Sequence, residues 1–296
     1  MDKTEKLINA ICMLMEENSS FKEAISSVDG NSIEIKISNA KGSYYYVSNN
    51  NLHTIELGVS CVPVLYDMCK CVCNSYSFNS DFHLEVDYSI IHRTFFKDRF
   101  FIIIEDKVCS PIPSDVIKSI DFLSNDKLTN ADKLTLFAFS YSLFHEIGHA
   151  IYNDQIPDEM KREKKADMFS FEMGKALDEN LGKGNNCRLW GLFVGLSQML
   201  LARTIQEEEE DVNHPHSLER LEALFDFWNI PNDSNLWKFA CEIIFKWIEQ
   251  NDMNPSLIWQ TNCELSSKER FLAACSYFKK IKYGYSIYGH DSHCLG

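Results

Sequence analysis

The amino-acid sequence predicts an α+β fold, in which a small antiparallel N-terminal sheet packs with a mainly helical part. Two observations lead to this prediction. Residues 32–60 contain short segments that alternate apolar and polar side chains, which is typical of half-buried strands. From residue 113 onward the patterns become helical, as in the long segment 130–153. We expect a β-rich region over 1–112 and a helical region over 113–296, together forming one compact domain.

Three segments are the predicted strands of the sheet. The stretch "SIEIKIS" at 32–38 alternates apolar and polar residues, and "SYYYVS" at 43–48 follows it after the turn residues "NAKG". A second turn, "NNN", leads into "HTIELGVS" at 53–60. Short turns between successive strands indicate an antiparallel meander. An apolar helix is expected next, over 61–78.

Three other segments before residue 130 have simpler patterns. Residues 1–27 are typical of a short amphipathic helix, and 113–125 fits a second helix. The run rich in Phe and Ile within 93–106 predicts a buried strand. These segments complete the expected N-terminal region and its connection to the helical part.

The C-terminal half is predicted to be helical. The segment 130–153 is apolar nearly all round, with Asn130 as its N-cap, and is expected to be central and buried. A charged helix over 157–180 and an apolar helix over 187–206 follow. The acidic run at 207–211 is expected to be a solvated connection. Further helices are expected up to about residue 280.

Composition and charge limit the classes of protein to which this chain could belong. The chain has 296 residues and a net charge of −14, which repels phosphate backbones and argues against nucleic acid as a partner. Eleven cysteines are an odd number scattered along the chain, which favours free thiols in a reducing compartment. The longest strongly apolar run, 189–202, is too short to span a bilayer, and the N-terminus lacks the pattern of a signal peptide. These features predict a soluble cytoplasmic protein.

The stretch "HEIGH" at 145–149 has the spacing of a metal site on a helix. His145 and His149 are four residues apart, so both imidazoles can reach one metal ion from the same helical face. Glu146 is turned about 100° away from His145 and is a candidate general base beside the metal. The alternative is a chance match, with two buried core histidines and an exposed glutamate.

A third metal ligand is expected from the next helix, because a catalytic zinc ion usually takes three protein ligands. In "EKKAD" at 163–167, Glu163 and Asp167 share one helical face. Glu163 is the candidate ligand, and Asp167 is the candidate partner that orients a ligand histidine from the second layer around the metal. Both residues could instead be solvated charges on a helix rich in Lys and Glu. Weaker candidates for the ligand are Asp154, Asp158 and Glu159.

Downstream, "HPHSLER" at 214–220 contains candidates for stabilising an oxyanion. His214 or Arg220 near an open metal position can stabilise the negative charge that develops during peptide hydrolysis, and His216 offers the same chemistry. The alternative is a helix start that carries a surface histidine.

Taken together, these three segments resemble the Lit-type zinc metallopeptidases, the bacterial phage-exclusion peptidase family. The family pattern is H-E-x-x-H, then E-x-x-A-D, then H-P with an arginine six residues after the histidine, and the quoted segments match each fixed position. Related elements occur in membrane-embedded zinc peptidases, but those carry transmembrane helices that this sequence lacks. The resemblance implies a zincin-like helical part, a zinc cofactor, elongation factor Tu as the protein substrate and a phage-derived activating peptide.

Other interpretations stay open at this stage. A zinc protease with another target, such as a toxin or a regulatory protease, would use the same residues. A non-catalytic sensor with a structural metal would need a fourth protein ligand, which His214 could supply. The three cysteines Cys69, Cys71 and Cys73 are expected to pack in an apolar helix rather than bind a second metal.

Overall fold

The computed structural model describes the chain in several stretches, which are 33–38, 45–49, 52–58, positions 65, 68, 69 and 72, 130–152, 155–180, 187–259 and 265–283. The chain divides into two compact units, 1–202 and 203–296, and each is described by itself. The predicted helices over 1–27 and 113–125, the predicted strand over 93–106 and the predicted boundary at residue 112 lie outside the described residues.

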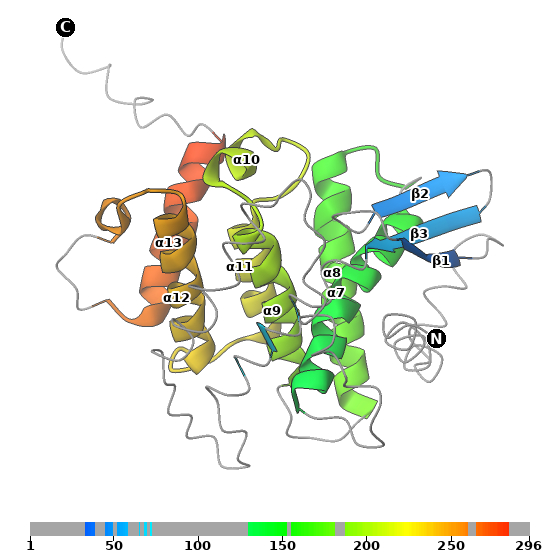
Figure 1. Ribbon diagram of the computed structural model, residues 1–296, viewed down its shortest axis with the longest axis horizontal. Helices are drawn as coiled ribbons and strands as arrows, with labels where there is room; N and C mark the ends of the chain where they lie inside the picture. The colour runs from blue at the N-terminus through cyan, green and yellow to red at the C-terminus, as the bar shows by residue number, and fades with distance from the viewer. Residues whose placement is uncertain are drawn as a thin grey trace, which may run out of the picture. The chain divides into compact units, whose positions relative to one another are not determined.

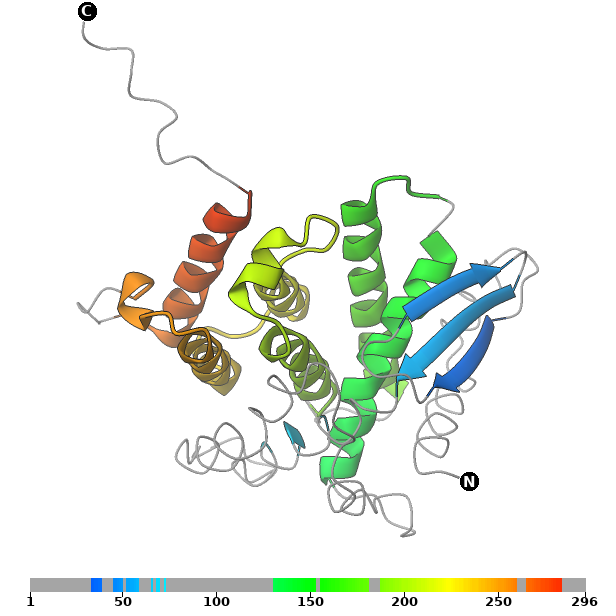
Figure 2. The same cartoon turned by 45° about the horizontal axis from the view of Figure 1, so that its top comes forward.

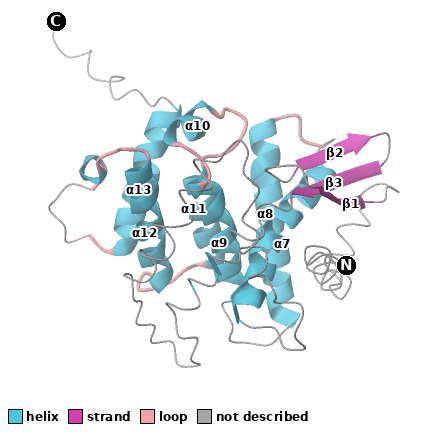
Figure 3. Cartoon of the chain, viewed as in Figure 1, coloured by secondary structure: helices cyan, strands magenta, loops and turns pink. Residues whose placement is uncertain are grey.

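The prediction of an α+β fold is wrong, because the described part of the chain is mainly helical (Figure 3). The strands that it contains are short: β1 (Ile33–Ser38), β2 (Tyr45–Asn49) and β3 (Leu52–Gly58). Their order is β1-β3-β2, with β2 antiparallel to β3 but β1 parallel to it, so the predicted antiparallel meander is also wrong. Alternation locates a strand, but it does not say which neighbour the strand pairs with.

The first unit is built around one long buried helix, α7 (Asn130–Tyr152). It packs against α8 (Glu159–Asn180), α9 (Cys187–Leu201) and strands β2 and β3 of the sheet (Figures 1 and 2). Glycines let these helices approach closely. A Cβ on Gly191 would lie 2.4 Å from the Cβ of Phe137, and one on Gly195 would lie 2.8 Å from the carbonyl oxygen of Ala138.

The segment predicted as an apolar helix over 61–78 is described at four positions. Leu65, Met68, Cys69 and Val72 are helical and buried. Their spacing of three and four residues places them on one helical face, which is the pattern of core packing. Cys69 is therefore a core residue, as the sequence predicts, while Cys71 and Cys73 lie outside the described residues.

The second unit contains α10 (Ile205–Glu210), α11 (Ser217–Trp228), α12 (Asn235–Gln250), η2 (Pro255–Leu257) and α13 (Ser267–Tyr283). Aromatic side chains form much of its core, with Phe225, Trp237 and Phe271 in mutual contact. The expected solvated connection at 207–211 is instead part of the short helix α10, and Glu208 within it is fully buried. A capping box between Thr204 and Glu207 starts this helix, so the segment predicted as one helix over 187–206 is interrupted.

Candidate functional site

Two neighbouring helices bring together the three predicted metal ligands. His145 Nε2 and His149 Nε2, one turn apart on α7, lie 3.0 Å from each other. Glu163 reaches across from α8 and places its two carboxylate oxygens 3.2 Å from His145 Nε2 and 3.0 Å from His149 Nε2. The ligand atoms of the three residues all lie within 4.8 Å of one another, so they could hold a single metal ion.

Close packing of α7 on α8 allows this convergence. A Cβ on Gly148 would lie 2.8 Å from the Cα of Ala166 and 3.1 Å from its Cβ, so glycine is the side chain that fits between the helices. Ser170 adds a hydrogen bond from its hydroxyl to the backbone oxygen of Tyr141, at 3.2 Å. The close approach at Gly148 brings Glu163 on α8 to face the two histidines on α7.

The donor set fits a zinc ion. Two imidazole nitrogens and one carboxylate are a known ligand combination of zinc hydrolases, with a fourth position left open. Three carboxylate residues of the two motifs are also buried. Glu146, Glu163 and Asp167 are each at most 9% exposed. Burying so much negative charge is unfavourable without compensation, and a divalent cation would provide it.

Asp167, for which the sequence predicts a second-layer role, lies beside His145. Its Oδ1 lies 2.9 Å from His145 Nδ1, on the opposite side of the imidazole from the ligand nitrogen Nε2. The two atoms are within hydrogen-bonding distance but lack the alignment of a full hydrogen bond. Hydrogen bonds in functional sites are often poorly aligned in the empty protein and become aligned only when the site is occupied.

Tyr141 is a member of the site that the motifs do not include. Its hydroxyl donates a 2.7 Å hydrogen bond to Asp167 Oδ1, the same oxygen that faces His145. Tyr141 is four residues before His145 on α7, so the helical spacing that links His145 to His149 also extends back to Tyr141. This four-residue spacing is the one sequence feature that could have indicated Tyr141 as a member of the site. It does not distinguish Tyr141 from the other buried residues of this helix.

The weaker ligand candidates are not part of this group. The Asp158 carboxylate accepts a hydrogen bond from the backbone N–H of Lys161, which caps the first turn of α8. Glu159 is paired with Arg162 at 3.5 Å. Asp154 lies outside the described residues.

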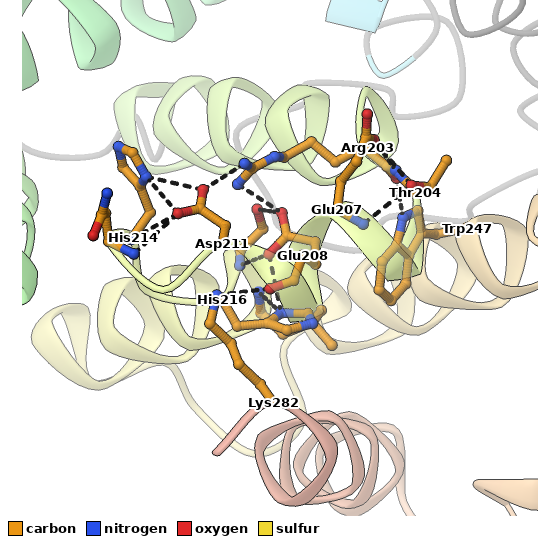
Figure 4. A network of polar contacts seen from close by, with 12 residues as sticks. Arg203, Thr204, Glu207, Glu208, Asp211, His214, His216, Trp247 and Lys282 are labelled. Atoms are coloured by element: carbon orange, nitrogen blue, oxygen red, sulfur yellow. Dashed lines mark hydrogen bonds and ion pairs between the residues drawn. The ribbon is translucent and has the colours of Figure 1, made fainter. Parts of the chain in front are cut away.

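His214 and Arg220 belong to the second unit. His214 is half exposed and precedes α11, whereas Arg220 lies on α11 and is buried. His214 Nδ1 lies 2.9 Å from the carboxylate of Asp211, and the same carboxylate accepts the backbone N–H groups of Asn213 and His214 (Figure 4). Arg203 completes this arrangement with a 2.5 Å contact to Asp211. The roles predicted for His214 and Arg220 stay predictions.

The charge on Asp211 follows from this environment. Partial burial acts to raise the pKa of Asp211, but hydrogen bonds from Arg203 and His214 and their positive charges outweigh burial and lower it below its usual range. A carboxylate cannot donate a hydrogen bond, so the nitrogen of His214 that faces it must carry the proton. Asp211 therefore fixes the tautomer of His214, a relationship that the sequence motif did not reveal.

His216 has a structural position. It is fully buried, its Nδ1 accepts the backbone N–H of Leu218 at 3.1 Å, and it thereby caps α11. Its ring contacts the rings of Trp247 and Phe278. Burial lowers the pKa of His216 to about 4, against the opposing effect of Glu208, so the ring is neutral at pH 7.

The described residues thus define a helical protein with a candidate metal site of two histidines and one glutamate. A family model described as Peptidase U49 matches residues 93–240, which is half of the 296-residue chain. The chain belongs to the Peptidase U49 family and is therefore a peptidase. The expected peptidase activity class is confirmed by this membership, while the narrower Lit-type assignment stays a prediction.

Two other comparisons add no further relative. Searches of curated proteins and of solved structures gave no match. In the described part of the chain, none of the helices is long and apolar enough to span a membrane.

Proposed function

We propose that this peptidase is a zinc-dependent endopeptidase of the HExxH type that cleaves a cytoplasmic protein. The observation that carries the proposal is the convergence of His145, His149 and Glu163, whose ligand atoms lie within 4.8 Å of one another. These three residues would hold the zinc ion. When bound, zinc supplies Lewis-acid activation of the scissile carbonyl group and of a water molecule.

Glu146 is the general base in this proposal. It follows His145 on α7, and helical geometry turns it about 100° away from that ligand, which suits a base beside the metal better than a further ligand. Glu146 takes the proton of the attacking water and passes it to the leaving amine. Its burial, with only 9% of the residue exposed, supports this role. A carboxylate that is shielded from water accepts a proton more readily, because burial disfavours its charged form.

We assign stabilisation of the oxyanion to His214. Asp211 engages Nδ1 of the ring, so Nε2 is the nitrogen assigned to the substrate. The side chain is 46% exposed, which suits a group that must meet a substrate. Arg220 is the second candidate for this role.

The substrate and its control are proposed from the resemblance of the three motifs to the Lit-type family. Elongation factor Tu is the proposed substrate, and a phage-derived peptide is the proposed activator. A cytoplasmic location follows from such a substrate. An activator also has a physical rationale, since a protease that is active at all times would damage its own host.

The test compares the purified wild-type protein with Glu146→Gln. Both are loaded with zinc and incubated with elongation factor Tu, and separately with a bacterial extract, with and without extract from phage-infected cells. We expect the variant to keep its zinc and to lose cleavage by about 10²–10⁴-fold, because only proton transfer is removed. The matched control, Glu159→Gln, changes a more exposed glutamate at the start of α8 and should cleave like the wild type.

Each result has a defined meaning. Cleavage by Glu146→Gln at the wild-type rate would refute the proposed mechanism. Cleavage of another protein in the extract, with elongation factor Tu intact, would favour a toxin or regulatory protease. Zinc binding without any cleavage by the wild type would favour a metal-binding sensor, and equal cleavage with and without the infected extract would refute the proposed activator.

A further inference from the structure

The buried Tyr141 side chain in the first unit contacts three other side chains, those of Phe171, His145 and Asp167. It is 1% exposed, and its ring stacks on Phe171 with the centroids 6.2 Å apart. The ring also contacts His145, with a centroid distance of 6.1 Å. Its hydroxyl donates to Asp167 Oδ1 at 2.7 Å. The position of this hydroxyl is therefore fixed by packing as well as by the hydrogen bond.

The hydrogen bond fixes the carboxylate in turn. Asp167 comes from α8 and Tyr141 from α7, so their contact crosses between the two helices that carry the ligands. The oxygen that accepts the Tyr141 proton also lies 2.9 Å from Nδ1 of His145. A deprotonated carboxylate only accepts hydrogen bonds, so the His145 proton belongs on Nδ1 and the lone pair of Nε2 is directed at Glu163 and His149.

We infer that Tyr141 is a positioning residue for the metal site: its hydroxyl holds Asp167, and Asp167 holds His145 in the tautomer and orientation that bind the metal. This inference rests on the proposed function, since it assigns His145 as a ligand. Partners of this outer layer orient ligand histidines in metalloproteins, and their loss typically weakens metal binding by about 10- to 100-fold. Tyr141 acts through Asp167 and does not contact the substrate.

The experiment measures zinc affinity of the full-length protein by competition with a chromophoric chelator. Tyr141→Phe removes the hydroxyl and keeps the ring that packs against Phe171. We expect about 10-fold or greater loss of zinc affinity. The cobalt-substituted variant should also show an altered visible spectrum, because the ligand geometry around the metal would change.

A matched control separates positioning from general packing. Ser170→Ala removes another buried hydroxyl between the same two helices, the one that donates to the backbone oxygens of Tyr141 and Ala166. We expect this variant to bind zinc within about twofold of the wild type, since its bonds do not reach the Asp167 carboxylate. Equal loss of affinity in both variants, or no loss in Tyr141→Phe, would overturn the inference.

A second measurement does not depend on the folding of any variant. The ¹⁵N resonances of the histidine rings in the zinc-loaded wild type report which nitrogen carries the proton. We expect His145 to be protonated on Nδ1 and coordinated through Nε2. Coordination through Nδ1 would overturn the inference, because the nitrogen that faces Asp167 would then bind the metal.

Failure of the inference and failure of the proposed function give different results. Zinc affinity is measured without substrate, so a wild-type protein that binds zinc and cleaves nothing refutes the peptidase mechanism while the Tyr141 comparison still stands. A wild-type protein that takes up no zinc refutes both.

Discussion

Gly148 of α7 lies directly against Ala166 of α8, and a Cβ at position 148 would come within 2.8 Å of the Ala166 Cα. The contact is one residue before the candidate ligand His149 and one residue before Asp167 on the partner helix. Protein interiors are packed too densely to absorb an added methyl group without movement. The contact therefore sets the separation of the two helices at the place where the metal ligands face each other.

The first prediction concerns this contact. Gly148→Ala should lower the free energy of unfolding by about 1–3 kcal/mol, because the methyl group overpacks the helix interface. It should also weaken zinc binding, since Glu163 would move away from the histidines. Gly195→Ala is the control, because its Cβ would lie 2.8 Å from the Ala138 carbonyl oxygen at the interface of α7 with α9. Thermal unfolding and chelator competition should show loss of stability in both and loss of affinity in Gly148→Ala only; unchanged affinity there would contradict the prediction.

The second prediction concerns the ligand from α8. Elemental analysis of the wild type should give about one zinc ion per chain, as expected for a single catalytic site. Glu163→Ala should lose most of this zinc, because the carboxylate that faces both histidines is removed. Glu159→Ala, at the start of the same helix, should retain it. Full zinc content in Glu163→Ala would show that another residue supplies the third ligand.

The third prediction is a pH dependence of stability caused by His216. The pKa of this buried residue is lowered to about 4 from an ordinary value near 6.5, so the unfolded chain binds its proton more readily than the folded one. The stabilisation is complete above pH 6.5 and is lost as the pH falls from about 6.5 to about 4, by up to about 3 kcal/mol. Protonation would also end the capping contact to Leu218.

Chemical denaturation at a series of pH values tests this prediction against His216→Asn. Asparagine is a good N-cap residue but does not titrate, so this variant should lose the part of the pH dependence that His216 contributes. An identical pH profile in the two proteins would assign the acid sensitivity to other groups.

The fourth prediction concerns the tautomer of His214. When neutral, this residue should carry its proton on Nδ1, because the Asp211 carboxylate faces that nitrogen at 2.9 Å. Asp211→Ala removes the acceptor, and the ring should then return to the mixture of tautomers of an exposed histidine. The ¹⁵N shifts of the ring give the answer directly. A proton on Nε2 in the wild type would mean that Asp211 does not orient the ring.

The local parts of the site were predictable from the sequence because they depend on helical periodicity alone. A spacing of four residues aligns His145 with His149, and also Glu163 with Asp167. That these two pairs face each other depends on the pairing of α7 with α8, and the short connection between the helices favours that pairing. Tyr141 was not predicted, because its part in the site is defined by one hydrogen bond from α7 to α8.

The remaining errors come from partners that are distant in the sequence. β1 pairs with β3 rather than with its neighbour in sequence, and local alternation contains no information on this choice. Glu208 lies in a run of acidic residues that indicates solvent exposure. It is buried because Ser217 donates two hydrogen bonds to its carboxylate, at 2.9 Å and 2.6 Å. A composition-based interpretation cannot anticipate such a partner.

The ligand atoms all come from one pair of helices joined by a short connection, and this has a consequence for how the chain folds. Only 13 residues lie between His149 and Glu163, the nearest ligands on the two helices. Closing so short a loop carries a small entropic penalty, so the metal-binding group can form before contacts between distant segments. A metal ion that binds this hairpin stabilises it by mass action, and the second unit is not needed for that step. Zinc supply during synthesis would then influence how much of the protein reaches its folded state.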